Sequence, residues 1–359
     1  DASILKGNYG YDRYNMSGNV DIKLTPALSM RYTTSFRISN TLMPGNPDVD
    51  WNLFYYIYAS EPTVGVMTKD NPSHYSEVNE HMNVAALLNP EASGYAKTIG
   101  RSWNNTVDFT YNAPFLKGLT VTATGAYDYS TNKSRTLILS YKTYDYETDT
   151  YAGELRTQDE YSELWTDNVR LYARAQANYN KKIGSHNFTA MLGAEMTNTK
   201  NASIQALRKY GATADESFYT HDIINQGLSS TSTNAGTRSE NASAGYIGRF
   251  TYDYQGKYLV ELMGRYDGTY VYAPGHRWGF FPSYSLGWRA SEEKFIKENI
   301  PFLNNLKFRW SDGKTGSIQG GAFQVTNHLV HGSSLTVQQL QASTLQLLRT
   351  QSSHGQTFV

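Results

Sequence analysis

The fold is decided by residues 246–289, which read YIGRFTYDYQGKYLVELMGRYDGTYVYAPGHRWGFFPSYSLGWR. From Tyr246 to Tyr254 apolar and polar residues alternate. After Gln255-Gly256-Lys257 the alternation resumes from Tyr258 to Tyr266. Side chains two apart share a face of a strand, so each run predicts a ribbon with one apolar and one polar face. The Gly-containing turn between the runs predicts an antiparallel hairpin. A third run of the same kind covers 278–289.

These runs suit a bilayer better than an ordinary soluble sheet. Each spans roughly nine to eleven residues, whereas typical strands have about five or six, and about ten residues cross a bilayer at a tilt near 45°. Aromatic residues mark both ends of the runs, as in the aromatic girdles of outer-membrane barrels. The alternative is a long-stranded soluble sandwich whose apolar face lies in a core.

The same pattern recurs along the chain. We predict about ten long strands, with the other runs near 14–24, 28–38, 103–111, 119–129, 169–179, 188–196 and 306–310. Their connections alternate between short and long, which is typical of barrels with tight turns at one end and long loops at the other. Long connections are expected at 39–101, 130–168 and 197–245, and the connection at 290–305 is an exception because it falls on the short-turn side. The expected fold is therefore all-β, an antiparallel transmembrane β-barrel present in part.

Composition narrows the classes of function. The chain has 359 residues, 32 basic and 32 acidic, so nothing indicates a nucleic-acid partner. There are 29 Tyr, whose apolar ring and polar hydroxyl suit membrane interfaces and carbohydrate or peptide contacts. Mean hydropathy is −0.55 and no apolar run reaches the roughly 20 residues of a membrane helix. The chain has no Cys, which excludes disulfides and thiolate metal sites.

Several segments of the chain are specific enough to compare with known families: KYLVE (257–261), RYDG (265–268), APGHRWGFFPS (273–283), GWRASEE (287–293) and FLNNLK (302–307). Together they resemble the barrel of SusC-like TonB-linked outer-membrane transporters, a TonB-dependent receptor family. The resemblance covers roughly residues 10–316. It implies a 22-stranded barrel with an N-terminal plug, in the outer membrane of Gram-negative, Bacteroidetes-type bacteria. It also implies active import of glycans or peptides, driven through TonB, under a SusD-like surface lipoprotein.

Only part of that apparatus is expected here. The sequence shows neither a plug nor a TonB box, so we interpret 1–316 as a partial barrel that is inactive alone. An open sheet would leave edge N–H and C=O groups unpaired in hydrocarbon. Residues 317–359 contain no Tyr, no Trp and no acidic residue, and we interpret them as a tail that is disordered or foreign to the barrel.

No catalytic site, cofactor site or metal site is predicted. On a helix His74, Glu77 and His81 would share a face, but neither zinc-protease spacing is present, so a solvated polar loop is the better interpretation. A barrel enzyme would need an acid, base or nucleophile cluster at one rim, and His is too scattered to supply it. The alternative to a transporter is a soluble β-rich carbohydrate-binding or adhesive module, which would be monodisperse without detergent.

Candidate substrate contacts are aromatic residues of the first long connection and arginines of the polar face. Aromatic rings stack on sugars or peptide side chains. For the aromatics, the competing interpretation is a loop that packs its own rings or places them in the upper girdle. For the arginines, it is a salt-bridged inner wall or contact with the plug. The candidates are Trp51, Tyr55, Tyr56, Tyr58, Arg31 and Arg37.

Overall fold

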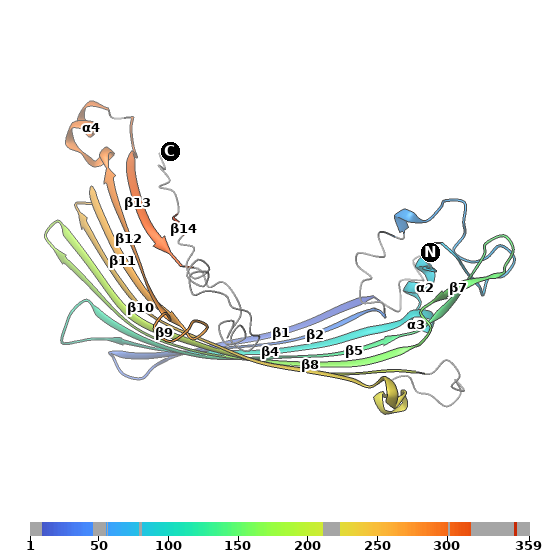
Figure 1. The fold of residues 1–359 in the computed structure, drawn as a ribbon. Helices are drawn as coiled ribbons and strands as arrows, with labels where there is room; N and C mark the ends of the chain where they lie inside the picture. The colour runs from blue at the N-terminus through green and yellow to red at the C-terminus, as the bar shows by residue number, and fades with distance from the viewer. Residues whose placement is uncertain are drawn as a thin grey trace, which may run out of the picture.

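The computed structural model describes residues 9–45, 55, 57–78, 81–210, 223–300 and 302–316, together with the backbone of 348–349. Its main feature is one curved antiparallel sheet in which each long strand pairs with its neighbours in sequence (Figure 1). The ten long strands are β1 (Gly10–Lys23), β2 (Leu28–Pro44), β4 (Gly94–Asn112), β5 (Leu119–Ile138), β8 (Glu160–Ile183), β9 (His186–Lys209), β10 (Thr233–Tyr254), β11 (Tyr258–Thr269), β12 (Trp278–Arg289) and β13 (Lys307–Thr315). A two-residue strand, β14 (Leu348–Arg349), pairs with the end of β13.

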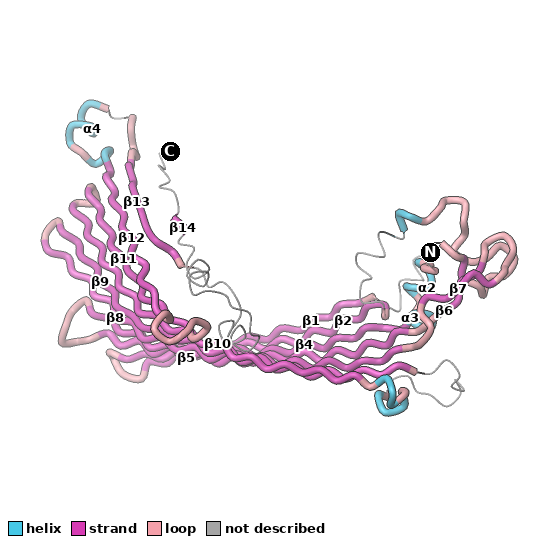
Figure 2. The backbone as a smooth tube through the Cα atoms, in the orientation of Figure 1, coloured by secondary structure: helices cyan, strands magenta, loops and turns pink. Residues whose placement is uncertain are grey.

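The sheet is open, with β1 at one edge and β13–β14 at the other. The predicted partial barrel of ten strands is therefore confirmed. The tube trace in Figure 2 shows the strands running side by side as a curved wall. None of the described helices is long and apolar enough to cross a bilayer.

The predicted turn chemistry is present at the short-turn end. Gln255 and Gly256 both have positive φ, 56° and 68°, and link β10 to β11. Gly118 has φ 100°, and a Cβ there would collide with the carbonyl oxygen of Asn180 on β8. Only glycine satisfies both demands at that position.

The strands are longer than the runs on which the prediction was based. β8 and β9 have 24 residues each, β10 has 22, and β4 begins at Gly94. Much of 94–101, 130–138, 160–168, 197–209 and 233–245 was expected to be loop and is strand. In these extensions polar residues occur on both faces and apolar ones such as Leu164, Trp165 and Ile204 are scattered, so the alternation fades while the backbone ladder continues.

The two faces of the sheet differ as predicted. Large apolar side chains of one face are exposed, including Met16 at 75%, Leu192 at 70% and Phe280 at 62%. No layer within the described part of the chain packs on this face, which contradicts the soluble sandwich. The opposite face carries the charged side chains described below. A sheet with an uncovered apolar face is what a bilayer-spanning wall requires.

A small folded unit lies at the long-loop end, here named the long-loop subdomain. Figure 1 shows it beside the ends of the strands, opposite α4. It contains β3 (Tyr75–Ser76), β6 (Tyr141–Tyr144), β7 (Tyr151–Leu155), α2 (Val84–Leu88) and α3 (Pro90–Ser93). Strands β3, β6 and β7 form a separate three-stranded sheet. Ala86, Leu87 and Tyr141 form its buried core.

Two other connections have short helices. The β9–β10 connection has η2 (Ile224–Gln226) and η3 (Ser229–Thr231). The 290–306 connection has η4 (Ala290–Glu292) and α4 (Lys294–Asn299), at the short-turn end as predicted. It is held by Glu293, whose carboxylate accepts hydrogen bonds from the Tyr258 hydroxyl at 2.6 Å, Trp288 Nε1 at 3.2 Å and Lys257 Nζ at 3.3 Å.

Candidate functional site

The polar face of the sheet carries a row of charges that crosses most of its width, here named the charge row. Its members occupy consecutive register positions, so they lie side by side along the hydrogen-bonding direction. In strand order they are Asp21, Arg31, Asp108, Thr124, Arg174, Glu195 and, past Gly245, Asp267.

Neighbouring members of the charge row neutralise one another. Arg31 Nε lies 2.6 Å from Asp21 Oδ1, and the Thr124 hydroxyl donates to Asp108 at 2.6 Å. At the other end Arg265 Nη2 bridges Glu195 at 2.7 Å and Asp267 at 3.0 Å. Polar or oppositely charged partners thus compensate much of the row, although Arg174 makes no ion pair within the described residues. Such a surface suits the wall of a water-filled passage and would be costly against lipid.

A polar hollow of about 430 Å³ lies farther toward the long-loop end on strands β1, β2, β4, β5 and β8. Arg170 Nη2 contacts Asp128 Oδ2 at 2.6 Å, and Arg13 Nε donates to Asn15 at 2.9 Å. Arg37 also lines the hollow, and within the described residues it has no ion pair. Three arginines against one aspartate give this hollow a net positive charge.

The predicted site residues fall in different places. Arg37 lines the polar hollow, whereas Arg31 lies near the short-turn end in its ion pair with Asp21. Tyr55 and Tyr58 belong to the first long connection and are 51% and 90% exposed. The positions of Trp51 and Tyr56 lie outside the described residues. Arg31 is therefore separated from the aromatic candidates by the length of β2, and the substrate contacts of all six stay a prediction.

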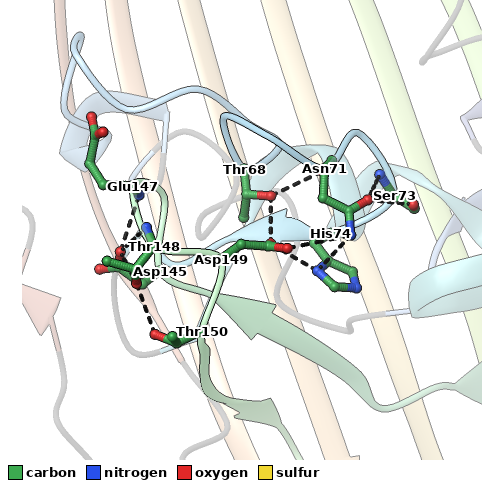
Figure 3. A network of polar contacts seen from close by, with 9 residues as sticks. All are labelled: Thr68, Asn71, Ser73, His74, Asp145, Glu147, Thr148, Asp149 and Thr150. Atoms are coloured by element: carbon green, nitrogen blue, oxygen red, sulfur yellow. Dashed lines mark hydrogen bonds and ion pairs between the residues drawn. The ribbon is translucent and has the colours of Figure 1, made fainter.

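The long-loop subdomain has a polar network that joins two distant segments (Figure 3). Asp149 accepts hydrogen bonds from the Thr68 hydroxyl at 2.7 Å and from His74 Nδ1 at 2.8 Å. The His74 ring stacks on Tyr144 with centroids 3.8 Å apart. Hydrogen bonds from Thr68 and His74 hold the pKa of Asp149 below its ordinary value.

A second histidine–carboxylate pair lies beside the first. His81 Nδ1 is 2.8 Å from Glu77, which also accepts from the Thr143 hydroxyl at 2.6 Å. Burial raises the pKa of Glu77, but hydrogen bonds from Thr143 and His81 outweigh it and leave the pKa low.

His74 and His81 lie in loop segments and are partly exposed, as expected of a polar loop, but each is also paired with a carboxylate of the folded subdomain. The segment is not helical, since Tyr75–Ser76 is a strand and His81 has φ 63°. The two histidines serve different carboxylates, and the described residues contain no group of three metal-binding side chains. The partners Asp149 and Thr143 could not be found from local sequence, because they lie 75 and 62 residues from their histidines.

Sequence comparison finds similarity to TonB-dependent receptors. No family model matches the chain. The TonB-dependent receptor SusC of Bacteroides thetaiotaomicron is 27% identical over 215 residues, which are 58% of this chain and 19% of SusC. The TonB-dependent receptor P39 of Formosa agariphila is 36% identical over 104 residues, 29% of this chain and 10% of P39.

Comparison with solved structures finds similar folds among outer-membrane transporters. The RagAB peptide importer in its "open-open" state matches with a TM-score of 0.64 at 17% identity, covering 88% of this chain and 33% of the solved chain. Its "closed-closed" state matches with a TM-score of 0.62 at 16% identity, covering 88% of this chain and 34% of that chain. The chain is thus similar in sequence to part of SusC and other TonB-dependent receptors, and its fold is similar to part of the RagAB importer.

The SusC-like chain is thus an outer-membrane protein of a Gram-negative bacterium, as the resemblance implied. It spans about a third of the solved chains that it matches. In such barrels short turns face the periplasm and long loops face outward. The 290–306 connection is therefore periplasmic, and the long-loop subdomain lies at the cell surface.

Proposed function

We propose that the SusC-like chain forms part of the wall of a TonB-dependent active transporter that imports glycans or peptides. A SusD-like surface lipoprotein would cover the long-loop end, and TonB would supply energy through parts beyond those described. The observation that carries this proposal is the two-faced sheet, with uncovered apolar residues on one side and the charge row on the other. The names of the relatives, TonB-dependent receptors and a peptide importer, support it.

Transport requires a closed cylinder. Strand β1 pairs with β2 on one side only, so its other edge presents backbone N–H and C=O groups. Each such group costs several kcal/mol when it is left unpaired in hydrocarbon. We therefore expect the described wall to be inactive alone and to work only when further strands pair its edges.

Substrate would pass along the polar face. The polar hollow offers the Arg37 guanidinium without a charged partner among the described residues, whereas Arg31 is neutralised by Asp21. Exposed Tyr55 and Tyr58 would offer rings to sugars or peptide side chains nearer the surface. Arg37 is thus the stronger of the two arginine candidates.

The test is growth of a strain that lacks the receptor. We expect loss of growth on one class of nutrient, an oligosaccharide or a peptide mixture, and the same loss when TonB is deleted. Rescue with the Arg37→Ala receptor should restore uptake several-fold less well than rescue with Arg31→Ala. Normal growth of the deletion strain on all such nutrients would refute the import function. Recovery of the protein in the soluble fraction would favour the carbohydrate-binding or adhesive module.

A further inference from the structure

The apolar face of the sheet is not uniformly convex. A groove of about 640 Å³ crosses it over strands β5 and β8–β12, here named the lipid-face groove. Its lining has no charged side chain. The groove lies on the apolar face, opposite the charge row, so it cannot belong to a substrate passage along the polar face.

Small residues make the floor of this groove. Ala175, Ala177, Ala194 and Gly248 contribute little or no side chain, whereas the Phe280 ring lies over Gly264, 3.0 Å from where a Cβ would stand. The rings of Tyr246, Tyr266 and Phe280 stand together in register and form its outer rim. Contact with lipid in general requires only apolar side chains, so it does not explain why small residues lie beside a row of aromatic rings here.

The groove lies in the interior of the wall. Its strands are paired on both sides, and closing the barrel at β1 and β13 would add strands beyond them. It is also continuous with the rest of the exposed apolar face. Whatever fills it must therefore come from the hydrocarbon layer or from another molecule in the membrane plane.

A basic residue stands at the periplasmic foot of the groove. On β8 the alternation that places Ala175 and Ala177 on the apolar face also places Tyr179 and Lys181 there. Lys181 lies four residues from Ala177, about 13 Å along the strand. It is exposed and has no ion pair within the described part of the chain. At the membrane–water boundary a lysine on the lipid side fits a phosphate headgroup.

We propose that the lipid-face groove binds a phospholipid of the periplasmic leaflet, with an acyl chain between the rim and the Gly/Ala floor and its phosphate at Lys181. The aromatic rim closes the groove on the outer side over β10–β12, where the same register row continues as Ala194 and Ala175 on β9 and β8. The β5–β8 end reaches Val121 and Ala177, two residues from the paired Leu119 and Tyr179 at the periplasmic end, where Lys181 stands. The lipid therefore enters from the periplasmic side. The site rests on the outer-membrane location and not on which nutrient is imported.

The test uses the receptor that contains this chain, purified from outer membranes and reconstituted in phosphatidylethanolamine vesicles. The probe is a phosphatidylglycerol with a diazirine in one acyl chain, and labelled peptides are mapped by mass spectrometry. We expect labelling to concentrate on β9–β11. Diacylglycerol with the same diazirine chain should label the groove less, because it has no phosphate for Lys181.

Two variants with matched controls localise the site. Gly248→Leu fills the floor, and its Cβ would meet only Leu192 at an ordinary 3.6 Å, so the strand can accept it. We expect labelling to fall about tenfold. Lys181→Gln should lower phosphatidylglycerol labelling about fivefold and leave diacylglycerol labelling unchanged.

The controls are Lys182→Gln, on the opposite face of β8, and Gly18→Leu, on the apolar face of β1, where a Cβ meets only a Thr34 methyl at 3.9 Å. Both should leave labelling unchanged. Labelling spread evenly around the barrel, or unaffected by Gly248→Leu, would overturn the proposal. The proposal would also be overturned if the groove were not labelled and the receptor formed a dimer that Gly248→Leu dissociates. A second copy of the chain, and not a lipid, would then fill the groove.

Discussion

The bilayer-spanning wall and the long-loop subdomain place their apolar side chains in opposite environments. In the wall Leu192 is 70% exposed, whereas in the subdomain Leu87 is 0% exposed and packs against Tyr141. The wall is held by its backbone ladder and by lipid, and the subdomain by a small water-excluding core. The same residue type therefore has a different energetic meaning in the two regions, and substitutions can separate them.

The largest expected effect comes from charge on the two faces of one strand. Phe250 is on the apolar face of β10 and Thr251 is beside it on the polar face, opposite Glu261. Phe250→Lys should lower the free energy of unfolding in bilayers by about 2–4 kcal/mol, because a lysine deep in the lipid layer is costly. Thr251→Lys should change it by less than about 1 kcal/mol. Urea unfolding in phospholipid vesicles measures both, and equal effects would show that both faces contact water.

Leucine-to-alanine substitutions test the same difference between the wall and the long-loop subdomain through loss of apolar contacts. Leu87→Ala should destabilise the long-loop subdomain by about 2–4 kcal/mol, since it opens a cavity beside Ala86 and Tyr141. Leu192→Ala should cost less than about 1 kcal/mol, because lipid fills the space. Hydrogen exchange read separately on residues 63–93 and on β9 gives the two values. A larger loss for Leu192→Ala would mean that protein, not lipid, covers that face.

Acid should loosen the subdomain before the wall. The pKa of Asp149 is lower folded than unfolded, so its hydrogen bonds stabilise the fold above its ordinary pKa of about 3.9. That stability is lost as the pH falls below this value through the folded pKa. Hydrogen exchange at residues 68–76 should therefore rise below about pH 4. Asp149→Asn should raise it at neutral pH and flatten the pH profile, and an unchanged profile would contradict the role of this carboxylate.

The smallest effect is expected on the polar face. Arg31 and Asp21 have side chains 62% and 65% exposed, and ion pairs so exposed contribute little to stability because water and salt screen them. Arg31→Gln should therefore leave the unfolding midpoint in urea nearly unchanged. A clear fall in that midpoint would show that the charge row supports the fold.

The sequence predicted the wall well where lipid imposes alternation. The hairpin of 14–38 and that of 246–266 have the predicted faces, and 290–306 lies on the predicted side. The strand extensions were missed because polar residues occur on both of their faces, so residue type does not alternate with strand geometry there.

The candidate site was less predictable. Alternation places Arg31 and Arg37 on the polar face, but only the register shows that Asp21 neutralises Arg31 and that no described carboxylate pairs with Arg37. The Asp149–His74 contact joins residues 75 apart, and nothing local in either segment indicates it. Long-range contacts between loops depend on three-dimensional closure that periodicity does not encode.

The Glu293 carboxylate, with donors from both β11 and β12, divides the 290–306 connection into two shorter loops. Loop-closure entropy grows only slowly with length, so residues can be added after this anchor near the start of the connection at little entropic cost. This margin of the barrel can consequently vary in length over evolution while the strands that follow keep their alignment.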